Sequence, residues 1–86
     1  MRVDLALKRL LLVKSRTEGK EACDVGAVRI NGTPVKASAE VRPGDRVSVA
    51  YAHHTLEIEL LEEIGKNVSR AQAKSFYRVL RDEQTE

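Results

Sequence analysis

The fold is decided at residues 15–32, which read SRTEGKEACDVGAVRING. The stretch opens with Ser15 and has a glutamate three residues later, a capping-box pattern that predicts the start of a helix. The helix is expected over residues 16–25 and ends at Gly26, since glycine suits the left-handed position that follows a helix. Beyond Gly26 the apolar residues alternate, and Asn-Gly at 31–32 predicts a tight hairpin turn. The stretch therefore joins a helix to a β-sheet.

Another helix is predicted on the N-terminal side of this stretch. Helical spacing relates four apolar residues near the start of the chain, Val3, Leu7, Leu10 and Leu11. They predict a helix over residues 3–12 with one apolar face. The helix at 16–25 has a face of small residues that suits close packing against it, namely Gly19, Ala22 and Cys23. Gly19→Ala is expected to raise stability by about 0.5–1 kcal/mol, unless a neighbouring backbone lies against that position.

Turn residues divide the middle of the chain into short strands. Residues 33–36 are expected to return as the second strand of the hairpin, and Pro-Gly-Asp at 43–45 predicts another turn. Further strands are expected over residues 46–51 and 56–60, the last with its glutamates on the outer face. These segments predict a small, mostly antiparallel sheet.

The end of the chain is expected to form a helix. Ser69 followed by Gln72 repeats the capping-box pattern. One face of this helix would hold Ala73, Phe76, Tyr77 and Leu80. Residues 82–86 are expected to fray. The predicted fold class is α+β, with two N-terminal helices packed on a small, mostly antiparallel sheet and a short C-terminal helix.

The charge of the chain is divided unevenly along its length. The 86 residues, enough for one domain, carry a net charge of +2. Residues 1–46 contain ten Lys and Arg against six Asp and Glu, a net of +4, whereas residues 47–86 contain five against seven, a net of −2. This asymmetry favours a polyanionic partner for the front half, and a solvated helix face with local ion pairs is the competing interpretation.

Other classes of protein are disfavoured by what the sequence lacks. It has neither an apolar run of membrane-spanning length nor the pattern of a signal peptide, so a cytoplasmic protein without membrane contact is expected. The single Cys23 has no base on its helix and is interpreted as a small core residue. His53 and His54 are interpreted as turn residues, without further metal ligands. The chain is predicted not to be an enzyme and to need no metal or cofactor.

The order of the elements and the residues that fill them resemble one family. The motifs that carry the resemblance are Met1-Arg2-Val3-Asp4, Ser15-Arg16-Thr17 with Lys20, Gly26-Ala27-Val28-Arg29-Ile30-Asn31-Gly32, Val35-Lys36 and Val41-Arg42-Pro43-Gly44-Asp45. They resemble the S-four RNA-binding domain, named after a protein of the small ribosomal subunit. The resemblance covers about residues 1–50 closely and extends to about residue 60. It implies a domain at 1–61, followed by a linker and C-terminal helix at 62–86.

A chain of this length is similar to the small ribosome-associated S-four proteins, which include a heat-shock type and a quality-control factor. The resemblance implies binding to large-subunit ribosomal RNA and to tRNA, on large subunits that still carry peptidyl-tRNA after stalled translation. It also implies a quality-control elongation partner, a protein that recruits charged tRNA for the addition of C-terminal alanine tails. A monomer is expected.

The resemblance also implies which residues contact the RNA. The corresponding positions are Arg2, Arg16, Lys20 and Lys36, with Lys8, Arg9 and Lys14 as neighbours. Such cations attract phosphates because each neutralised phosphate releases a counterion, and arginine adds a planar fork for bidentate contacts. The sequence departs from the family pattern at Leu5, Ser15 and Ala27, where basic residues are common, and at Gly19, where alanine is usual.

The aromatic residues lie outside the basic part of the sequence. They are Tyr51, Phe76 and Tyr77. Recognition through phosphates and RNA shape is therefore expected, rather than stacking on bases.

The alternative function is a β-grasp-like protein-interaction module without RNA binding. Residues 28–49, with their two turns, also suit small sulfur carriers. Against a carrier role, the sequence closes with Gln84-Thr85-Glu86 and lacks a terminal Gly-Gly. An RNA-modifying enzyme is less favoured still, because these residues hold no catalytic domain.

Overall fold

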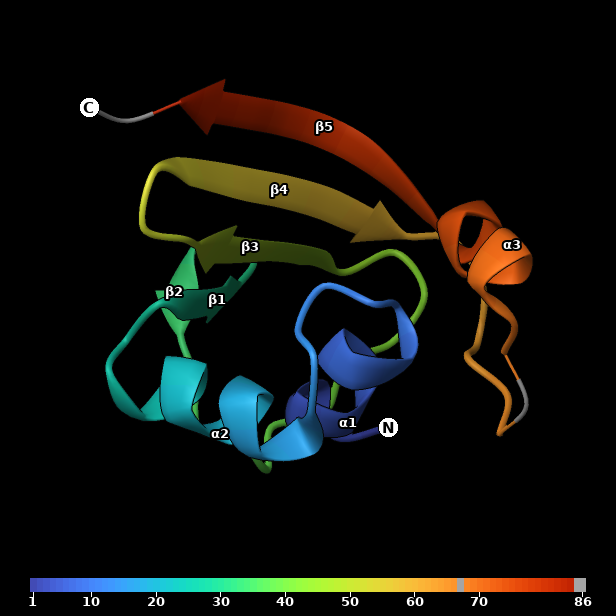
Figure 1. Cartoon of the computed structure of the whole chain (residues 1–86), viewed down its shortest axis with the longest axis horizontal. Coiled ribbons are helices and arrows are strands. Elements are labelled where there is room, and N and C mark those ends of the chain that lie inside the picture. Colours follow the sequence, from blue (N-terminus) through green and yellow to red (C-terminus); the bar gives the residue numbers. More distant parts are fainter. Residues whose placement is uncertain (67, 85–86) are drawn as a thin grey trace.

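Two helices lie together on one face of a five-stranded antiparallel sheet (Figure 1). The structure, a computed structural model, describes residues 1–66 and 68–84. The helices are α1 (Val3–Arg9) and α2 (Arg16–Asp24). The strands are β1 (Val28–Ile30), β2 (Thr33–Pro34), β3 (Arg46–Ala50), β4 (His54–Leu60) and β5 (Tyr77–Gln84), in the order β2-β1-β3-β4-β5. This arrangement confirms the predicted α+β class.

The core fills the space between the helix pair and the sheet. The alternation predicted for the middle strands is present, because Val47 and Val49 of β3 and Ile58 and Leu60 of β4 are buried. From the other side, α1 contributes its own buried apolar residues Val3, Ala6 and Leu7. Each fully buried Val, Leu or Ile side chain stabilises the fold by about 1.5–3 kcal/mol. The helix pair is therefore held at a defined position on the sheet.

The first helix is shorter than predicted because it ends in a Schellman motif. The N–H of Leu11 bonds to the carbonyl of Lys8 (3.0 Å), and the N–H of Leu12 bonds to the carbonyl of Leu7 (2.9 Å). Leu11 adopts a left-handed φ of 61°, and its side chain, predicted to lie on the apolar face, is 54% exposed. The prediction of a helix through residue 12 is wrong, because this motif is usually signalled by glycine or asparagine.

The second helix begins at Arg16 as predicted and ends at Asp24, one residue before the predicted end. The hydroxyl of Ser15 accepts a hydrogen bond from the N–H of Glu18 at 3.1 Å. The carboxylate of Glu18 accepts from the N–H of Lys14 (3.3 Å), one residue before the expected partner in a capping box. Gly26 follows the helix with a φ of 77°. The cap fixes Arg16 as the first residue of α2 and so sets where its side chain leaves the helix.

The two predicted turns are connected to each other by side chains. The residues at 31–32 have φ values of 52° and 84°, which is the tight hairpin turn expected of Asn-Gly. The Asn31 side chain accepts from the N–H of Arg46 (2.9 Å) and donates to the carboxylate of Asp45 (3.2 Å). The N–H of Asp45 bonds to the carbonyl of Arg42 at 3.0 Å, which closes the second turn. The return strand β2 is shorter than predicted.

The C-terminal region differs most from the prediction. A short helix is present, since α3 (Arg70–Ala73) has the expected capping box and is followed by the 3-10 helix η1 (Lys74–Phe76). The chain then becomes β5, which pairs with β4 at the edge of the sheet far from the helix pair (Figure 1). The prediction of one helix through Leu80 is therefore wrong. Residues 82–84, expected to fray, belong to β5, and residues 85–86 lie outside the described residues.

Side-chain shape and charge explain this strand. Aromatic and β-branched residues such as Tyr77 and Val79 favour extended structure. Glu59 of β4 lies opposite Arg78 and forms an ion pair with it, and Glu57 lies opposite Arg81. Opposite charges across neighbouring strands stabilise a sheet. The glutamates predicted to lie on the outer face of β4 are thus matched by arginines of β5.

Gly19→Ala is expected to lower the melting temperature. An alanine methyl group would lie 2.9 Å from the Asp4 carbonyl oxygen, a contact with rigid backbone. Moving the helices apart would cost about 1–3 kcal/mol, which exceeds the gain of about 0.5–1 kcal/mol in helix propensity. Thermal denaturation followed by circular dichroism measures the effect.

Gly65→Ala is the matched control, because its methyl group would meet no atom within 4 Å. Its melting temperature is expected to stay the same or to rise, since alanine restricts the unfolded chain more than glycine does. A Gly19→Ala variant at least as stable as the wild type would contradict the close helix contact.

Candidate functional site

The helix pair carries a cationic surface formed by Arg2, Arg16 and Lys20. The carboxylate of Asp4 lies at its centre. Its side chain is 3% exposed, and one oxygen accepts the N–H of Leu5 at 2.8 Å. Arg2 donates from Nε to Oδ1 and from Nη2 to Oδ2, both at 3.3 Å. Arg16 donates from Nε to Oδ2, also at 3.3 Å. A carboxylate buried without such partners would be costly, so Asp4 holds both arginines beside it.

The two arginines remain half exposed while they bind Asp4. Their side chains are 45% and 49% exposed for Arg2 and Arg16 respectively. A guanidinium has five N–H donors in a planar fork, and Asp4 engages two of Arg2 and one of Arg16. Most of the donors therefore stay available to a further acceptor, from side chains whose position is already set.

Lys20 joins the arginines in one shallow depression. It lies one turn after Arg16 on α2 and is exposed. The depression has a volume of about 300 Å³ and is lined by Arg2, Asp4, Arg16, Thr17 and Lys20. Three positive charges surround one negative charge, so the depression suits an anion.

Lys36 lies beside this depression because the chain after β2 runs along the start of α1. The N–H of Asp4 bonds to the carbonyl of Ala37 (3.3 Å), and the N–H of Val3 bonds to that of Ala39 (2.8 Å). Lys36 is exposed, one residue before the first of these contacts. The fold thus brings Arg2, Arg16 and Lys20 into one depression, and it places Lys36 next to a backbone segment that is bonded to the start of α1.

The other predicted residues lie further along the helix pair. Lys8 and Arg9 belong to the last turn of α1, where cations suit the negative end of the helix dipole. Arg9 donates from Nη1 to the carbonyl of Gly65 at 3.3 Å. Arg2 precedes the helix as its N-cap residue, so Arg2 and Arg9 make different contacts.

Lys14 lines a separate feature, which we call the Leu11 hollow. It has a volume of about 720 Å³ and is lined by Leu11, Leu12, Val13, Lys14, Glu18, Tyr51 and Arg70. The Tyr51 hydroxyl donates to the carbonyl of Leu12 at 2.6 Å. Burial raises the pKa of Tyr51 to about 12, so this hydroxyl stays a donor at neutral pH. The aromatic residues lie outside the basic part of the sequence, as expected, but in space Tyr51 and Lys14 line the same hollow.

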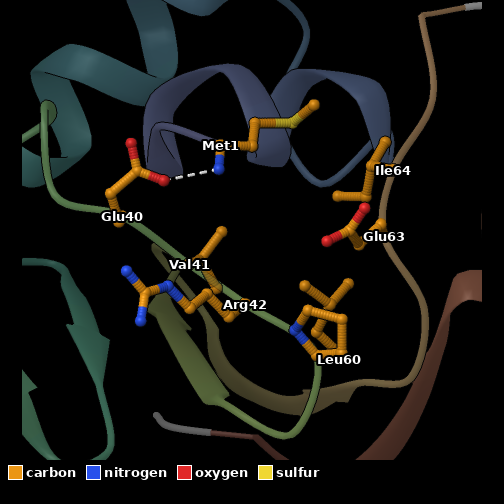
Figure 2. Close-up of a pocket in the computed structure, with 8 residues that line it drawn as sticks. Met1, Glu40, Val41, Arg42, Leu60, Glu63 and Ile64 are labelled. Carbon is orange, nitrogen blue, oxygen red and sulfur yellow. Dashed lines mark hydrogen bonds and ion pairs between the residues drawn. The ribbon is translucent and has the colours of Figure 1, made fainter.

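A third depression lies beside the first residue and has a volume of about 490 Å³ (Figure 2). Figure 2 shows the Met1 ammonium paired with the Glu40 carboxylate, at 2.6 Å, with Glu63 on the opposite side. A hydrogen bond from the ammonium, and its charge, hold the pKa of Glu40 below its usual value. The charged groups of this depression are the carboxylates of Glu40 and Glu63, the Arg42 guanidinium and the Met1 ammonium, so it has no excess of positive charge. This balance disfavours a phosphate.

Cys23 and His54 have structural contacts. Cys23 is 5% exposed, as predicted for a core residue. Burial, then Asp4 and Asp24, raise the pKa of its thiol, which disfavours the reactive thiolate. The interpretation of His54 as a turn residue is wrong, because His54 begins β4 and stacks on Tyr51, with ring centroids 4.6 Å apart.

Residues 1–66 and 68–84 contain neither a candidate metal centre nor a membrane-spanning helix. In that part of the chain, His, Cys, Asp and Glu form no group of three or more that could hold a metal ion. Over the same residues, every helix is too short or too polar to span a membrane.

Asp4 is the site residue that the sequence interpretation missed. In the sequence it stands out only as part of the motif Met1-Arg2-Val3-Asp4. A signal was present, because Asp4 directly follows Val3, a residue of the apolar face, and so lies close to the buried side of the helix. A carboxylate in that position needs cations nearby, and the neighbouring Arg2 was one candidate.

The fold and the site together define a class of small domain, in which a helix pair on an antiparallel sheet presents a cationic surface. The family follows from comparison with known proteins. The model of the S4 domain, the S-four family, matches residues 1–47. The chain belongs to the S4 domain family.

Curated relatives share one name across several bacteria. A protein of Bacillus subtilis named "RQC P-site tRNA stabilizing factor" is 35% identical, over 96% of this chain and 95% of its own. The protein of the same name from Listeria innocua is 35% identical, over 100% of this chain and 92% of its own. The one from Helicobacter pylori is 42% identical, over 81% of this chain and 84% of its own.

A solved structure shares the fold. The chain superposes on Heat Shock Protein 15 of Vibrio cholerae with a TM-score of 0.83 and 25% identity, over 92% of this chain and 80% of the other. That structure is described as trimeric. The match confirms the arrangement of helix pair and sheet predicted from the sequence.

Asp4→Asn is expected to lower the free energy of unfolding by about 1–2 kcal/mol, because charge-assisted hydrogen bonds to both arginines are lost. The penalty stays below the roughly 3–5 kcal/mol of a fully buried broken pair, since the guanidinium groups are half exposed and water can solvate them. Urea denaturation measures the change. Asp24→Asn is the control, an exposed acid near the end of α2, and a similar loss in both variants would argue against a special role of Asp4.

Proposed function

We propose that this protein is a ribosome-associated RNA-binding factor that acts in ribosome-associated quality control without catalysing a reaction. In this proposal it binds large-subunit ribosomal RNA and tRNA, on stalled large subunits that still carry peptidyl-tRNA. Residues 1–61 form the RNA-binding part, and residues 62–86 support it. It works in the cytoplasm as a monomer, together with a quality-control elongation partner.

One observation carries the proposal, namely the pair of half-exposed arginines that Asp4 holds in place. Ordering a long side chain costs conformational entropy on binding. Arg2 and Arg16 have lost part of that freedom in the folded protein, through their hydrogen bonds to Asp4. Their outward N–H groups match the oxygens of phosphates, which guanidinium groups bind in bidentate geometry. Lys20 adds a third cation to the same depression, and Lys36 is an exposed cation close to the start of α1.

The names of the curated relatives support a role beside the tRNA in the P site. The curated relatives are named for stabilising a tRNA in the P site during quality control, and this chain matches most of their length. A small basic surface suits that task, because it contacts the backbone of structured RNA without reading a sequence. Two RNA molecules that meet at the P site would both present phosphates to the helix pair.

The Arg2→Ala/Arg16→Ala double variant is expected to lose most of its binding to large ribosomal subunits that carry peptidyl-tRNA. Each arginine neutralises about one phosphate, so each single variant should lower the slope of log K against log salt by about one unit. Co-sedimentation through a sucrose gradient at several salt concentrations measures both effects.

The matched control is Arg29→Ala/Arg46→Ala, which removes the same charge from the sheet face opposite the helices. Both arginines are exposed, and each alternates with a valine buried in the core. This control is expected to bind nearly as well as the wild type. Unchanged co-sedimentation of the Arg2/Arg16 variant would overturn the proposal, and capture of proteins without RNA would favour the protein-interaction module instead.

A further inference from the structure

Leu11 combines two unfavourable features. Its φ of 61° is left-handed, which costs a residue other than glycine about 1–2 kcal/mol. Its side chain is 54% exposed, so the core does not compensate for that cost. Glycine or asparagine would end α1 equally well at this position. A strained, exposed leucine at the mouth of a hollow indicates that the side chain contacts something outside the protein.

The loop that carries Leu11 is held firmly in place. Its two flanking hydrogen bonds to the last turn of α1 complete the Schellman motif. The next residue, Leu12, is 9% exposed, and its carbonyl accepts the hydroxyl of Tyr51 at 2.6 Å. The Tyr51 ring is itself stacked on His54. The hollow is therefore preformed, and a ligand that enters it does not have to order the loop.

The chemistry of the lining indicates the ligand. Lys14 and Arg70 are exposed cations from different parts of the chain, one between the helices and one at the start of α3. The carboxylate, from Glu18, is engaged by the backbone N–H of Lys14 at 3.3 Å. The same hollow is also lined by the apolar side chain of Leu11 and the half-buried ring of Tyr51. Apolar and aromatic groups in one hollow with cations match a base and its adjoining phosphates.

We propose that the Leu11 hollow binds an unpaired nucleotide of the RNA, with Leu11 and Tyr51 against the base and Lys14 and Arg70 on the adjoining phosphates. This inference rests on the proposed function and adds a second contact to it. The hollow is distinct from the depression beside Asp4, and Lys14, which lines it, lies only two residues before Arg16 along the chain. The site would let a protein that otherwise binds phosphates distinguish an unstacked base from a regular helix.

Leu11→Gly separates binding from folding. Glycine relieves the left-handed strain, so the free energy of unfolding is expected to be unchanged or higher. Affinity for large ribosomal subunits that carry peptidyl-tRNA is expected to fall about fivefold or more, the loss of roughly one base contact. Leu11→Asn, which also tolerates this conformation, should behave in the same way and replaces the glycine variant if that one folds poorly. Arg70→Ala is expected to weaken binding and to lower the salt slope.

Val25→Ala is the matched control, because Val25 is a 79% exposed apolar residue at the end of α2 and outside the hollow. It is expected to bind as the wild type does. If the wild type binds and Leu11→Gly binds equally well, the inference is overturned while the proposed function stands. If the wild type itself fails to bind, both are overturned.

Ultraviolet crosslinking identifies the partner of the hollow directly. The chain has two tyrosines, so Tyr77 on β5 serves as an internal reference for Tyr51. After irradiation of the complex with the same ribosomal subunits, mass spectrometry is expected to find a nucleotide adduct on Tyr51 and none on Tyr77. An adduct on Tyr77 without one on Tyr51, or crosslinks from the hollow to a ribosomal protein alone, would overturn the assignment to RNA.

Discussion

The contact between Gly19 of α2 and the backbone of Asp4 is the constraint on which the rest of the site depends. Because no side chain separates the helices there, the start of α2 comes close to the first turn of α1. Arg16, the first residue of α2, then reaches the Asp4 carboxylate from one side, while Arg2 reaches it from the other. The packing of two short helices thus determines where two positive charges lie on the surface.

The Asp4 carboxylate has two opposite effects on phosphate binding by the arginines. The buried carboxylate cancels part of the positive charge and occupies some of the guanidinium donors. In return, it holds both side chains in one geometry, which lowers the entropy cost of binding a phosphate. This preorganisation is consistent with the smaller number of basic residues in this sequence. Three positions that are commonly basic in the family are Leu5, Ser15 and Ala27 here. Fewer cations are present, and the ones that remain at the centre are preorganised.

The sheet has a different role from that of the helix pair. Its inner face supports the helices through Val47, Val49 and Ile58, and its far edge is completed by β5. The arginines of β5 lie opposite glutamates of β4, so their charges are matched within the sheet. The arginines near the start of the chain have a single shared carboxylate between them. This difference explains why the arginines of β5 stabilise the sheet, whereas the arginines of the helix pair form a candidate binding surface.

The sequence by itself determined the features that depend on neighbouring residues. The Ser15 cap, the Gly26 ending, the Asn-Gly hairpin and the alternation of β3 are local, because backbone conformation and burial pattern are set within a few residues. The prediction that cationic residues of the helix pair contact RNA also came from the sequence, through its resemblance to a family. Tertiary structure decided what depends on distant partners. Leu11 takes a glycine-like conformation because its neighbours are anchored in the core, and Tyr77–Gln84 forms a strand because β4 offers an edge. Asp4 becomes the centre of the site, and Tyr51 comes to line the same hollow as Lys14, because packing brings together residues that the sequence keeps far apart.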